Sequence, residues 1–182
     1  MNGRKSKNIV LIGFMGCGKS TVGIKLSWKF KMPVIDTDKL IERDAGVSIS
    51  QIFEKQGETA FRDMETGLLK ELSEQSTTRI ISTGGGTPVR SENRAYLRAC
   101  GTVIYLRISP ECVYERLKED TTRPLLQCEN PLEKIRGLMQ SRKQAYEDCA
   151  HIIVDVDGLT MDQVLERIDE QINEYERQGV CE

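Results

Sequence analysis

The fold of this chain is decided by a stretch near its start, Gly13-Phe14-Met15-Gly16-Cys17-Gly18-Lys19-Ser20-Thr21. The stretch fits the pattern G-x-x-x-x-G-K-[ST], which is the phosphate-binding P-loop. An apolar run, Asn8-Ile9-Val10-Leu11-Ile12, precedes it and predicts a buried strand. Apolar residues recur at positions 22, 26 and 30 after it, and this spacing predicts a helix. The motif therefore lies between a strand and a helix, which is the context that its function requires.

Strand, glycine loop and helix together predict a site for an anion. The loop glycines let the backbone turn tightly and bring N–H groups near phosphate oxygens, and the helix N-terminus adds its unpaired N–H groups. We expect Lys19 to reach the β- and γ-phosphates and the Ser20 hydroxyl to ligate Mg²⁺. A chance glycine turn is the alternative, and the matching spacing and flanks disfavour it. The motif does not name the acceptor of the phosphate.

Length and composition exclude several classes of protein. The 182 residues fit one domain with its own core, and a net charge of −2 gives no support for nucleic-acid binding. The six cysteines have no C-x-x-C spacing and the chain has one histidine, so we expect free thiols of a reducing cytosol and no zinc site. No apolar stretch approaches the roughly 20 residues that span a membrane. We therefore expect a cytoplasmic protein without a membrane or nucleic-acid partner.

Strand-like runs alternate with helical patterns along the chain. The predicted strands are 8–13, 33–36, 79–83, 102–107 and 151–155. The predicted helices are 19–31, 38–45, 48–55, 58–75, 91–99, 110–118, 131–148 and 160–177. This alternation predicts a three-layer α/β/α fold with a five-stranded parallel sheet and helices on both faces. The segment 118–130 lacks periodicity and is expected to be a surface loop.

Two carboxylates, Asp36 and Asp38, end the second predicted strand. Ligands of a parallel α/β sheet bind beyond the carboxyl ends of the strands, so we expect both to face the P-loop. One would hold the magnesium shell, and the other would orient an acceptor hydroxyl or take its proton. Capping of the next helix is the alternative for one of them. The third strand, 79–83, ends without the acidic residue that could hold magnesium there, so Asp36 is the best candidate for the carboxylate that holds the metal.

A glycine run and an ion pair have two interpretations each. Gly84, Gly85 and Gly86 follow the third strand and favour close approach of a ligand to bare backbone, although an ordinary turn is the alternative. Arg62 and Glu65 are neighbours at i, i+3 on a predicted helix. They form either a solvated ion pair or a guanidinium held ready for a substrate carboxylate. The spacing alone does not distinguish these two.

Four arginines, Arg116, Arg123, Arg136 and Arg142, surround the predicted loop 118–130. Phosphoryl transfer spreads negative charge over the transferred group, and an arginine from a closing loop stabilises that charge. Arg123 has the best position for this role, whereas Arg136 is expected on the surface of a helix. His151 starts a strand-like run and is expected to be structural.

These residues together resemble the shikimate kinase family, P-loop kinases related in fold to the nucleoside monophosphate kinases. The resemblance covers nearly the whole chain. It is carried by the P-loop, Asp36-Thr37-Asp38, Ile52-Phe53, Gly57-Glu58, Phe61-Arg62-Asp63-Met64-Glu65, Thr83-Gly84-Gly85-Gly86, Arg123-Pro124-Leu125-Leu126, and Arg142 with Tyr146. The P-loop alone is generic, but the combined set in this order is specific.

The resemblance implies that the γ-phosphate of ATP is transferred to the 3-hydroxyl of shikimate, a step toward chorismate and the aromatic amino acids. It implies that Asp38 holds the acceptor hydroxyls and is the candidate base. Mg²⁺ would be contacted by Ser20 directly and by Asp36 through water. Arg62 and Arg142 would clamp the shikimate carboxylate. The backbone of Gly84, Gly85 and Gly86 would lie beside its ring.

For ATP, the resemblance implies a site made by Gly16, Cys17, Gly18, Lys19, Ser20, Thr21, Arg116 and Arg123. Arg123 would lie on a lid, about 118–130, that closes over ATP, and Arg116 would lie against the adenine. Lys19, Asp38 and Arg123 would be the catalytic residues. The resemblance further implies a monomeric, single-domain kinase with a substrate-binding segment at about 38–65. The family often has Arg and Pro near the adenine, where this chain has 155–159, so no site residue is assigned there.

Two alternatives stay open. A kinase for another hydroxy acid or sugar acid, such as gluconate, has the same P-loop, but Arg62 and Arg142 favour shikimate. A nucleotide-dependent switch or a silent sensor belongs to a different class. A GTPase switch needs an N-K-x-D motif, which the chain lacks, and a sensor is expected to lose Lys19, Asp38 or Arg123, which the chain keeps.

Overall fold

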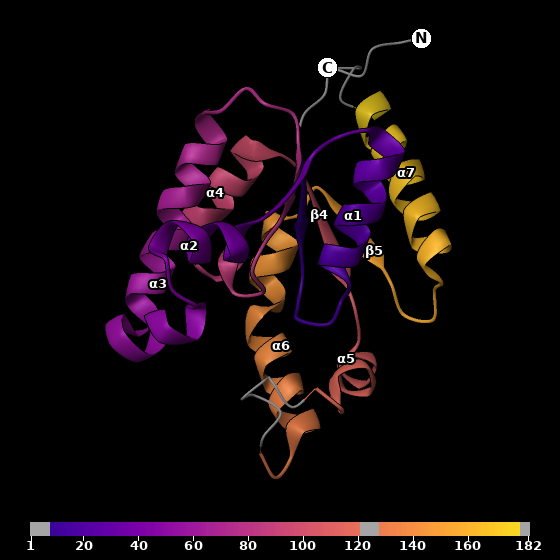
Figure 1. Ribbon diagram of the computed structural model, residues 1–182. Coiled ribbons are helices and arrows are strands. Elements are labelled where there is room, and N and C mark those ends of the chain that lie inside the picture. The colour runs from indigo at the N-terminus through magenta and orange to yellow at the C-terminus, as the bar shows by residue number, and fades with distance from the viewer. Residues whose placement is uncertain (1–7, 121–127, 179–182) are drawn as a thin grey trace.

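The computed structural model describes residues 8–120 and 128–178, and its centre is a parallel sheet in the order β2-β3-β1-β4-β5 (Figure 1). The strands are β1 (Asn8–Ile12), β2 (Val34–Asp36), β3 (Ile80–Ser82), β4 (Gly101–Arg107) and β5 (Ile152–Asp155). Val10 of the central strand β1 pairs with Ile81 on one side and Val103 on the other. The P-loop therefore follows the middle strand, where both neighbours fix its position.

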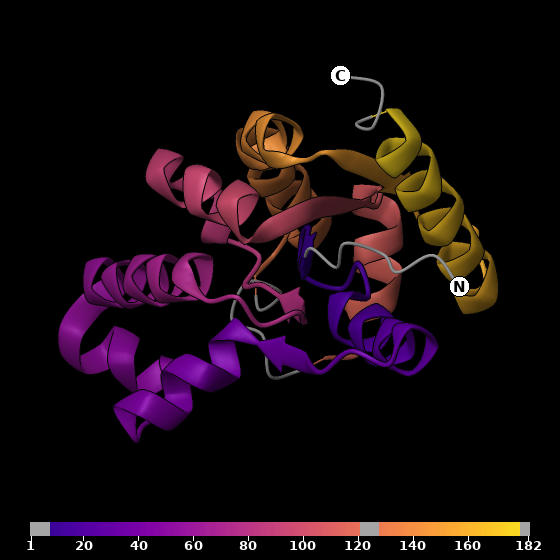
Figure 2. The ribbon, with the colours of Figure 1, turned by 90° about the horizontal axis from the view of Figure 1, so that it is seen from above.

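Helices cover both faces of this sheet. They are α1 (Lys19–Phe30), α2 (Thr37–Ala45), α3 (Ile49–Glu74), α4 (Ser91–Cys100), α5 (Pro110–Leu117), α6 (Pro131–Cys149) and α7 (Met161–Gln178), with a short 3₁₀ helix, η1 (Thr87–Val89). Helices α1 and α7 lie together on one face, while α4 and α6 lie on the other and α3 packs against α4 (Figure 2). The parallel α/β prediction is confirmed.

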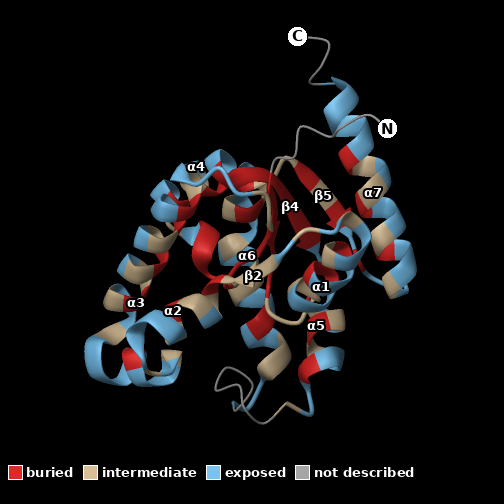
Figure 3. Cartoon of the chain, turned by 45° about the horizontal axis from the view of Figure 1, so that its top comes forward, coloured by how far each residue is buried: buried red, intermediate tan, exposed pale blue. Residues whose placement is uncertain are grey.

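The core is divided by the sheet into two layers. Ile9 and Leu11 of β1 belong to the cluster under α1 and α7, whereas Val10 and Ile12 belong to the cluster under α4 and α6. All four side chains are buried, and Figure 3 shows β4 in the red of buried residues, whereas the edge strand β2 is half-buried. Burial on both faces explains why the strands read as continuous apolar runs rather than alternating ones.

The predicted helices and strands agree with the structure to within one residue at each boundary. Helix α3 joins the predicted helices 48–55 and 58–75, but Gly57 within it has φ 82° and ψ 170°, which is not helical. The chain therefore kinks at the break that the sequence predicts. The 3₁₀ helix η1 was not predicted. Of the expected loop 118–130, residues 121–127 lie outside the described part of the chain.

A small separate core holds α2 against the first half of α3. Its buried members are Ile41, Ile52 and Phe61. Helix α3 starts with a capping box, in which the Ser48 hydroxyl accepts a hydrogen bond from the N–H of Gln51 and the Gln51 side chain accepts one from the N–H of Ser48. This α2–α3 unit projects from the edge of the sheet (Figure 1).

Two further findings concern the cysteines and the polarity of the helices in the described residues. The cysteines found there, Cys17, Cys100, Cys112, Cys128 and Cys149, are all free thiols. Across residues 8–120 and 128–178, the longer helices are too polar to cross a membrane.

Candidate functional site

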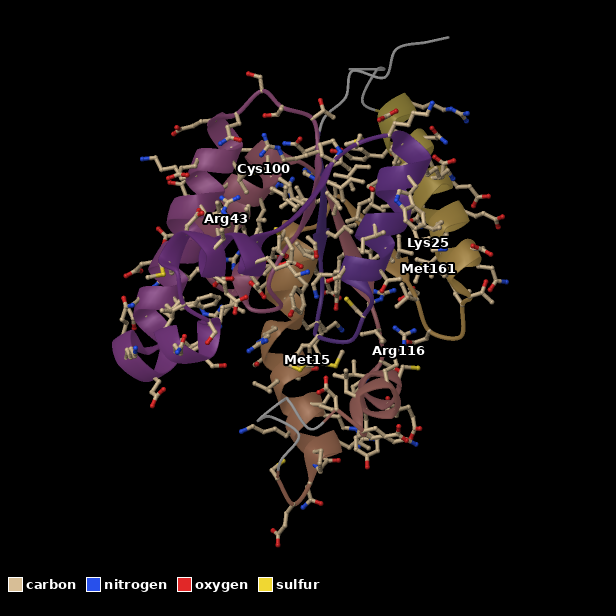
Figure 4. The ribbon with its side chains drawn as sticks, in the orientation of Figure 1. Met15, Lys25, Arg43, Cys100, Arg116 and Met161 are labelled. Atoms are coloured by element: carbon tan, nitrogen blue, oxygen red, sulfur yellow. The ribbon has the colours of Figure 1, made fainter. Side chains whose placement is uncertain are left out.

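A cavity of about 410 Å³ opens at the carboxyl end of the sheet. It is lined by Met15, Gly16, Gly18, Lys19, Ser20, Thr21, Asp36, Asp38, Ser82, Thr83, Gly84, Gly85, Arg116 and Leu117. Figure 4 shows Met15 and Arg116 at this same end of the molecule. The P-loop, the end of β2 and the segment after β3 thus meet in one space, as the parallel topology predicts.

The P-loop packs closely against the end of β4. Gly13 has φ 148°, and a Cβ placed there would lie 2.7 Å from the Leu106 carbonyl oxygen and 2.8 Å from Cys17 Sγ. Only glycine fits this close approach without displacing the backbone. The loop then enters α1, where the N–H of Val22 donates to the Gly18 carbonyl at 2.9 Å. The first N–H groups of α1 are left at the cavity, where an anion is favoured.

Lys19 lies folded over its own loop. Its ammonium donates to the carbonyl oxygens of Gly13 at 2.8 Å and Phe14 at 3.1 Å, and it lies 3.7 Å from Cys17 Sγ. These contacts hold one positive charge against the loop. Together with the N–H groups of α1, this charge makes the site complementary to phosphate.

Asp36 caps α2, which the sequence offered as one alternative, and it also contacts Ser20. Its Oδ1 accepts hydrogen bonds from the N–H groups of Asp38 at 3.1 Å and Lys39 at 3.3 Å, which caps α2. Its Oδ2 accepts from the Ser20 hydroxyl at 3.5 Å. This oxygen-only pair fits Mg²⁺, which is commonly held by few protein ligands together with waters and phosphates. No group of three or more His, Cys, Asp or Glu suited to a metal occurs among the described residues.

Asp38 has a half-buried side chain, whose Oδ1 atom is buried, and an unusual pKa. Burial raises the pKa of its side chain from 3.8 to about 6, with further increases from Asp36 and Glu65, while Lys19 and Arg62 act in the opposite direction. Its Oδ1 has no hydrogen-bond partner among the described residues. A carboxylate that titrates near neutral pH beside an open cavity is suited to accept a proton from a bound hydroxyl.

Arg62 and Glu65 do not form a solvated ion pair. Glu65 is only 1% exposed, and its Oε2 accepts from Arg62 Nη1 at 2.6 Å while its Oε1 accepts from the Thr87 hydroxyl. Arg62 also donates to Glu58 at 2.9 Å. Burial would lower the pKa of the guanidinium, but the hydrogen bonds and charges of both glutamates raise it. The geometry thus fixes the direction of the guanidinium, which the sequence spacing left open.

The glycine segment Gly84–Gly86 passes between Asp38 and Arg62. A Cβ at Gly84 would lie 2.7 Å from Asp38 Oδ1, and a Cβ at Gly86 would lie 2.6 Å from the Arg62 guanidinium. Any larger residue would displace one of these two side chains. Close approach of side chains therefore explains Gly84 and Gly86, whereas a Cβ at Gly85 would make only ordinary contacts, the nearest at 3.5 Å from the Gly13 carbonyl oxygen. The expected approach of a ligand to this backbone stays a prediction.

Thr87 and Asn93 support this segment and were not found from the sequence. Thr87 binds Glu65 through its hydroxyl, and its carbonyl accepts from Asn93 Nδ2 at 2.9 Å. Asn93 is fully buried and also accepts from the Thr66 hydroxyl at 2.7 Å. No periodicity or motif marks these residues, because their role depends on contacts between α3, η1 and α4.

Helix α6 brings Arg142 and Tyr146 to the other side of the glycine segment. The Arg142 guanidinium lies 5.7 Å from the centre of the Phe14 ring, within cation–π range. The Tyr146 hydroxyl donates to the Gly85 carbonyl at 2.5 Å. P-loop, glycine segment and α6 are therefore in mutual contact.

The other arginines differ in their positions. Arg116 of α5 lines the cavity and donates to the Gly16 carbonyl at 3.0 Å. Arg136 is exposed and paired with Glu111 and Glu133, as its predicted surface position requires. Arg123 lies outside the described residues.

Two positions away from the cavity have structural contacts. His151 Nδ1 accepts from the N–H of Val103 at 2.9 Å, which is a structural contact between β5 and β4. Asp157, in the segment with no assigned site residue, accepts from the N–H of Ser109 at 3.0 Å before α5.

Comparison with known proteins gives one consistent result. The family model for shikimate kinase matches residues 15–173. A shikimate kinase from Thermodesulfovibrio yellowstonii is 46% identical over 171 residues, which cover 94% of this chain and 96% of the relative. One from Enterococcus faecalis is 45% identical over 170 residues, which cover 92% and 99%.

Comparison with solved structures leads to the same family. Shikimate kinase from Acinetobacter baumannii in complex with shikimate has a TM-score of 0.86 at 37% identity, covering 93% of this chain and 94% of that one. A gluconokinase from Sinorhizobium meliloti has a TM-score of 0.56 at 16% identity, which shows a shared fold alone. This chain therefore belongs to the shikimate kinase family of ATP-using P-loop kinases.

Proposed function

We propose that this shikimate kinase transfers the γ-phosphate of ATP to the 3-hydroxyl of shikimate inside the 410 Å³ cavity described above. One observation carries the assignment of the site. Asp38, a half-buried carboxylate with a pKa of about 6, shares that cavity with Lys19 and the P-loop. A group that accepts a proton near neutral pH thus lies beside a group that binds phosphate, which is what phosphoryl transfer to a hydroxyl requires.

On the nucleotide side, backbone N–H groups of the P-loop and Lys19 bind the phosphates of ATP. Arg116, which already contacts Gly16 of the loop, lies against the adenine. Ser20 and Asp36 would hold Mg²⁺, Ser20 directly and Asp36 through water, and the bound ion supplies charge neutralisation at the β- and γ-phosphates. Lys19 balances the charge that develops on the transferred group, because an ammonium in a site shielded from water is worth more than in bulk solvent.

On the acceptor side, Asp38 accepts a hydrogen bond from the shikimate hydroxyl and takes its proton as the oxygen attacks. Arg62 and Arg142 bind the shikimate carboxylate, and the buried Glu65 keeps the Arg62 guanidinium in place. The backbone of Gly84–Gly86 lies against the ring. The resemblance to the family and the shikimate complex of the Acinetobacter baumannii enzyme support this arrangement.

Closure of a lid completes the proposed mechanism. The segment 118–130, with Arg123, closes over ATP, adds a second positive charge at the transferred phosphate and excludes water, so that ATP is not hydrolysed. We also propose that the enzyme acts as a monomer in the cytoplasm, and sedimentation equilibrium tests the monomeric state.

Release of ADP in the presence of ATP and Mg²⁺, with and without shikimate, tests the proposal. We expect fast release only with shikimate, together with a product heavier by one phosphoryl group and phosphorylated at the 3-hydroxyl. Gluconate in place of shikimate is the matched control and should give no release. If the enzyme prefers gluconate, the assignment of shikimate as the acceptor is wrong. If ATP binds and no acceptor is phosphorylated, the catalytic assignment fails and a sensor is indicated.

A further inference from the structure

Tyr146 is a large polar residue at a buried position, and the mechanism above does not use it. Its side chain is 1% exposed within the core cluster between the sheet and α4 and α6. The ring stacks on Tyr105 of β4, with the ring centres 5.0 Å apart and the planes 26° apart. A buried phenol needs a hydrogen-bond partner, and this one donates to the Gly85 carbonyl at 2.5 Å.

The hydrogen bond from Tyr146 holds the middle of the glycine segment, between two carbonyls that have backbone partners. The Gly84 carbonyl accepts from the N–H of Thr87 at 3.3 Å, and the Gly86 carbonyl accepts from the N–H of Val89 at 3.0 Å. The N–H of Gly84 donates to the Thr37 hydroxyl at 3.3 Å, which holds the start, and Thr87 is held at the end by Glu65. Glycine peptides rotate easily between such anchors. The described peptide bonds are all trans, so fixing the Gly85 carbonyl toward α6 turns the N–H of Gly86 away from α6.

The same hydrogen bond fixes α6 relative to the cavity. Arg142 lies four residues before Tyr146, so both side chains project from one face of the helix. Arg142 lies over Phe14 of the P-loop while Tyr146 contacts the glycine segment. A shift of α6 along its axis would therefore move Arg142 and break the Tyr146 contact together. Burial also raises the pKa of the Tyr146 phenol above its usual range, so it stays a donor at all working pH values.

We propose that Tyr146 is a positioning residue for shikimate binding, which fixes α6 against the glycine segment so that Arg142 reaches the carboxylate of the substrate. The inference rests on the proposed function of Arg142 and Gly84–Gly86. It assigns Tyr146 no contact with either substrate. Its effect is therefore expected in the KM for shikimate, and not in kcat or in the KM for ATP.

Tyr146→Phe tests this inference, because it removes one oxygen and keeps the stacked ring. We expect the KM for shikimate to rise about tenfold, since binding must then also order α6 against the glycine segment, at a cost of the order of one hydrogen bond. The kcat and the KM for ATP should stay within about twofold of the original enzyme. Tyr105→Phe is the matched control, because it removes a hydroxyl from the other ring of the stack, and it should change none of these constants. Circular dichroism and the unfolding midpoint verify that both variants fold.

A double-mutant cycle with Arg142→Ala separates positioning from a general structural role. If Tyr146 acts through Arg142, the tenfold effect of Tyr146→Phe should shrink to within about twofold in the Arg142→Ala background. An unchanged KM in Tyr146→Phe, or an equal rise in both backgrounds, overturns the inference. Failure of the proposed function is distinguishable, because the unmodified enzyme would then show no shikimate-dependent ADP release at all.

Discussion

The two halves of the cavity are built in different ways. The nucleotide half is the P-loop, which follows the central strand β1 and has a core layer on each face of the sheet. Its proposed binding groups are backbone N–H groups and Lys19. The acceptor half is built mainly on the α2–α3 unit, which has a small core of Ile41, Ile52 and Phe61 at the edge of the sheet. Its proposed binding groups are the charged side chains of Asp38 and Arg62, completed by Arg142 of α6 and the backbone of Gly84–Gly86.

Because of this difference, we expect global stability and the choice of acceptor to depend on different parts of the molecule. A loop attached to the middle of the sheet keeps its shape as long as the domain is folded, so phosphate binding and global stability depend on the same core. A unit with its own small core can open or shift while the sheet stays intact. We therefore expect changes in the α2–α3 unit to act on shikimate binding, and changes in the sheet to act on unfolding.

The largest expected effect is that of Asp38→Asn, which should lower kcat by about a thousandfold with little change in ATP affinity. The same change should stabilise the fold. Asp38 has a pKa of about 6 when folded and an ordinary value of 3.8, so its ionised form destabilises the folded state by up to ~3 kcal/mol above pH 6. This gain should shrink as the pH falls from 6 to 4, where both states become protonated.

Turnover assays and chemical denaturation at pH 8 and pH 4 check both parts. Asp44→Asn is the control, because Asp44 is an exposed carboxylate on the same helix, and it should leave turnover unchanged. Near-normal turnover of Asp38→Asn would contradict its role as base. If Asp38→Asn were less stable than the original enzyme at pH 8, desolvation of the ionised Asp38 would not be what destabilises the fold.

A matched pair of core substitutions tests the separation directly. Ile104→Ala in β4 and Ile52→Ala in α3 remove the same atoms from two fully buried positions. Ile104→Ala should lower the free energy of unfolding by about 3 kcal/mol, because the surrounding sheet core cannot collapse around the cavity. Ile52→Ala should lower it less and raise the KM for shikimate severalfold. Equal losses of stability with an unchanged KM would show that the two halves are not independent.

The pH dependence of kcat/KM for shikimate should report the Asp38 pKa. Because the base must be ionised, kcat/KM should fall tenfold per pH unit below about pH 6. Asp36→Asn should move this inflection to lower pH, since the charge of Asp36 raises the Asp38 pKa and asparagine still caps α2. A profile that is flat from pH 5 to pH 8, or an inflection that moves upward, would remove Asp38 as the titrating group.

The smallest effects are expected at two glycines of α3. Gly57, with φ 82° and ψ 170°, has a backbone conformation that alanine avoids, so Gly57→Ala should destabilise the enzyme by about 1–2 kcal/mol. Gly67 lies in the exposed interior of the same helix with nothing within 4 Å of an added Cβ. Gly67→Ala should therefore stabilise it by about 0.5–1 kcal/mol. Thermal unfolding of both variants measures the two changes in stability. If both substitutions stabilised the enzyme, or both destabilised it, the non-helical backbone at Gly57 would be contradicted.

The fold was predictable because its signals are local. The apolar runs, the P-loop and the break at Gly57 can each be recognised from a few neighbouring residues of the sequence. In contrast, residue spacing left the pair of Arg62 and Glu65 open between a solvated ion pair and an ordered guanidinium, and Thr87 and Asn93 gave no signal. Their roles arise where α3, η1 and α4 meet, and such contacts follow from the tertiary fold rather than from residue spacing. The binding and catalytic roles of the site residues, among them Arg123 and the residues expected to hold the metal, stay predictions.

The buried carboxylate of Glu65 has a consequence for how this enzyme can diversify. Because its two oxygens serve Arg62 and Thr87 at once, removing the arginine leaves an unpaired charge in the interior and also loosens the support of the glycine segment. A lineage that adopts a different acceptor therefore has to change positions 62 and 65 in concert. A mutant library that randomises position 62 alone will consist mostly of poorly folded members, whereas one that pairs both positions will retain folded members among which new acceptors can be selected.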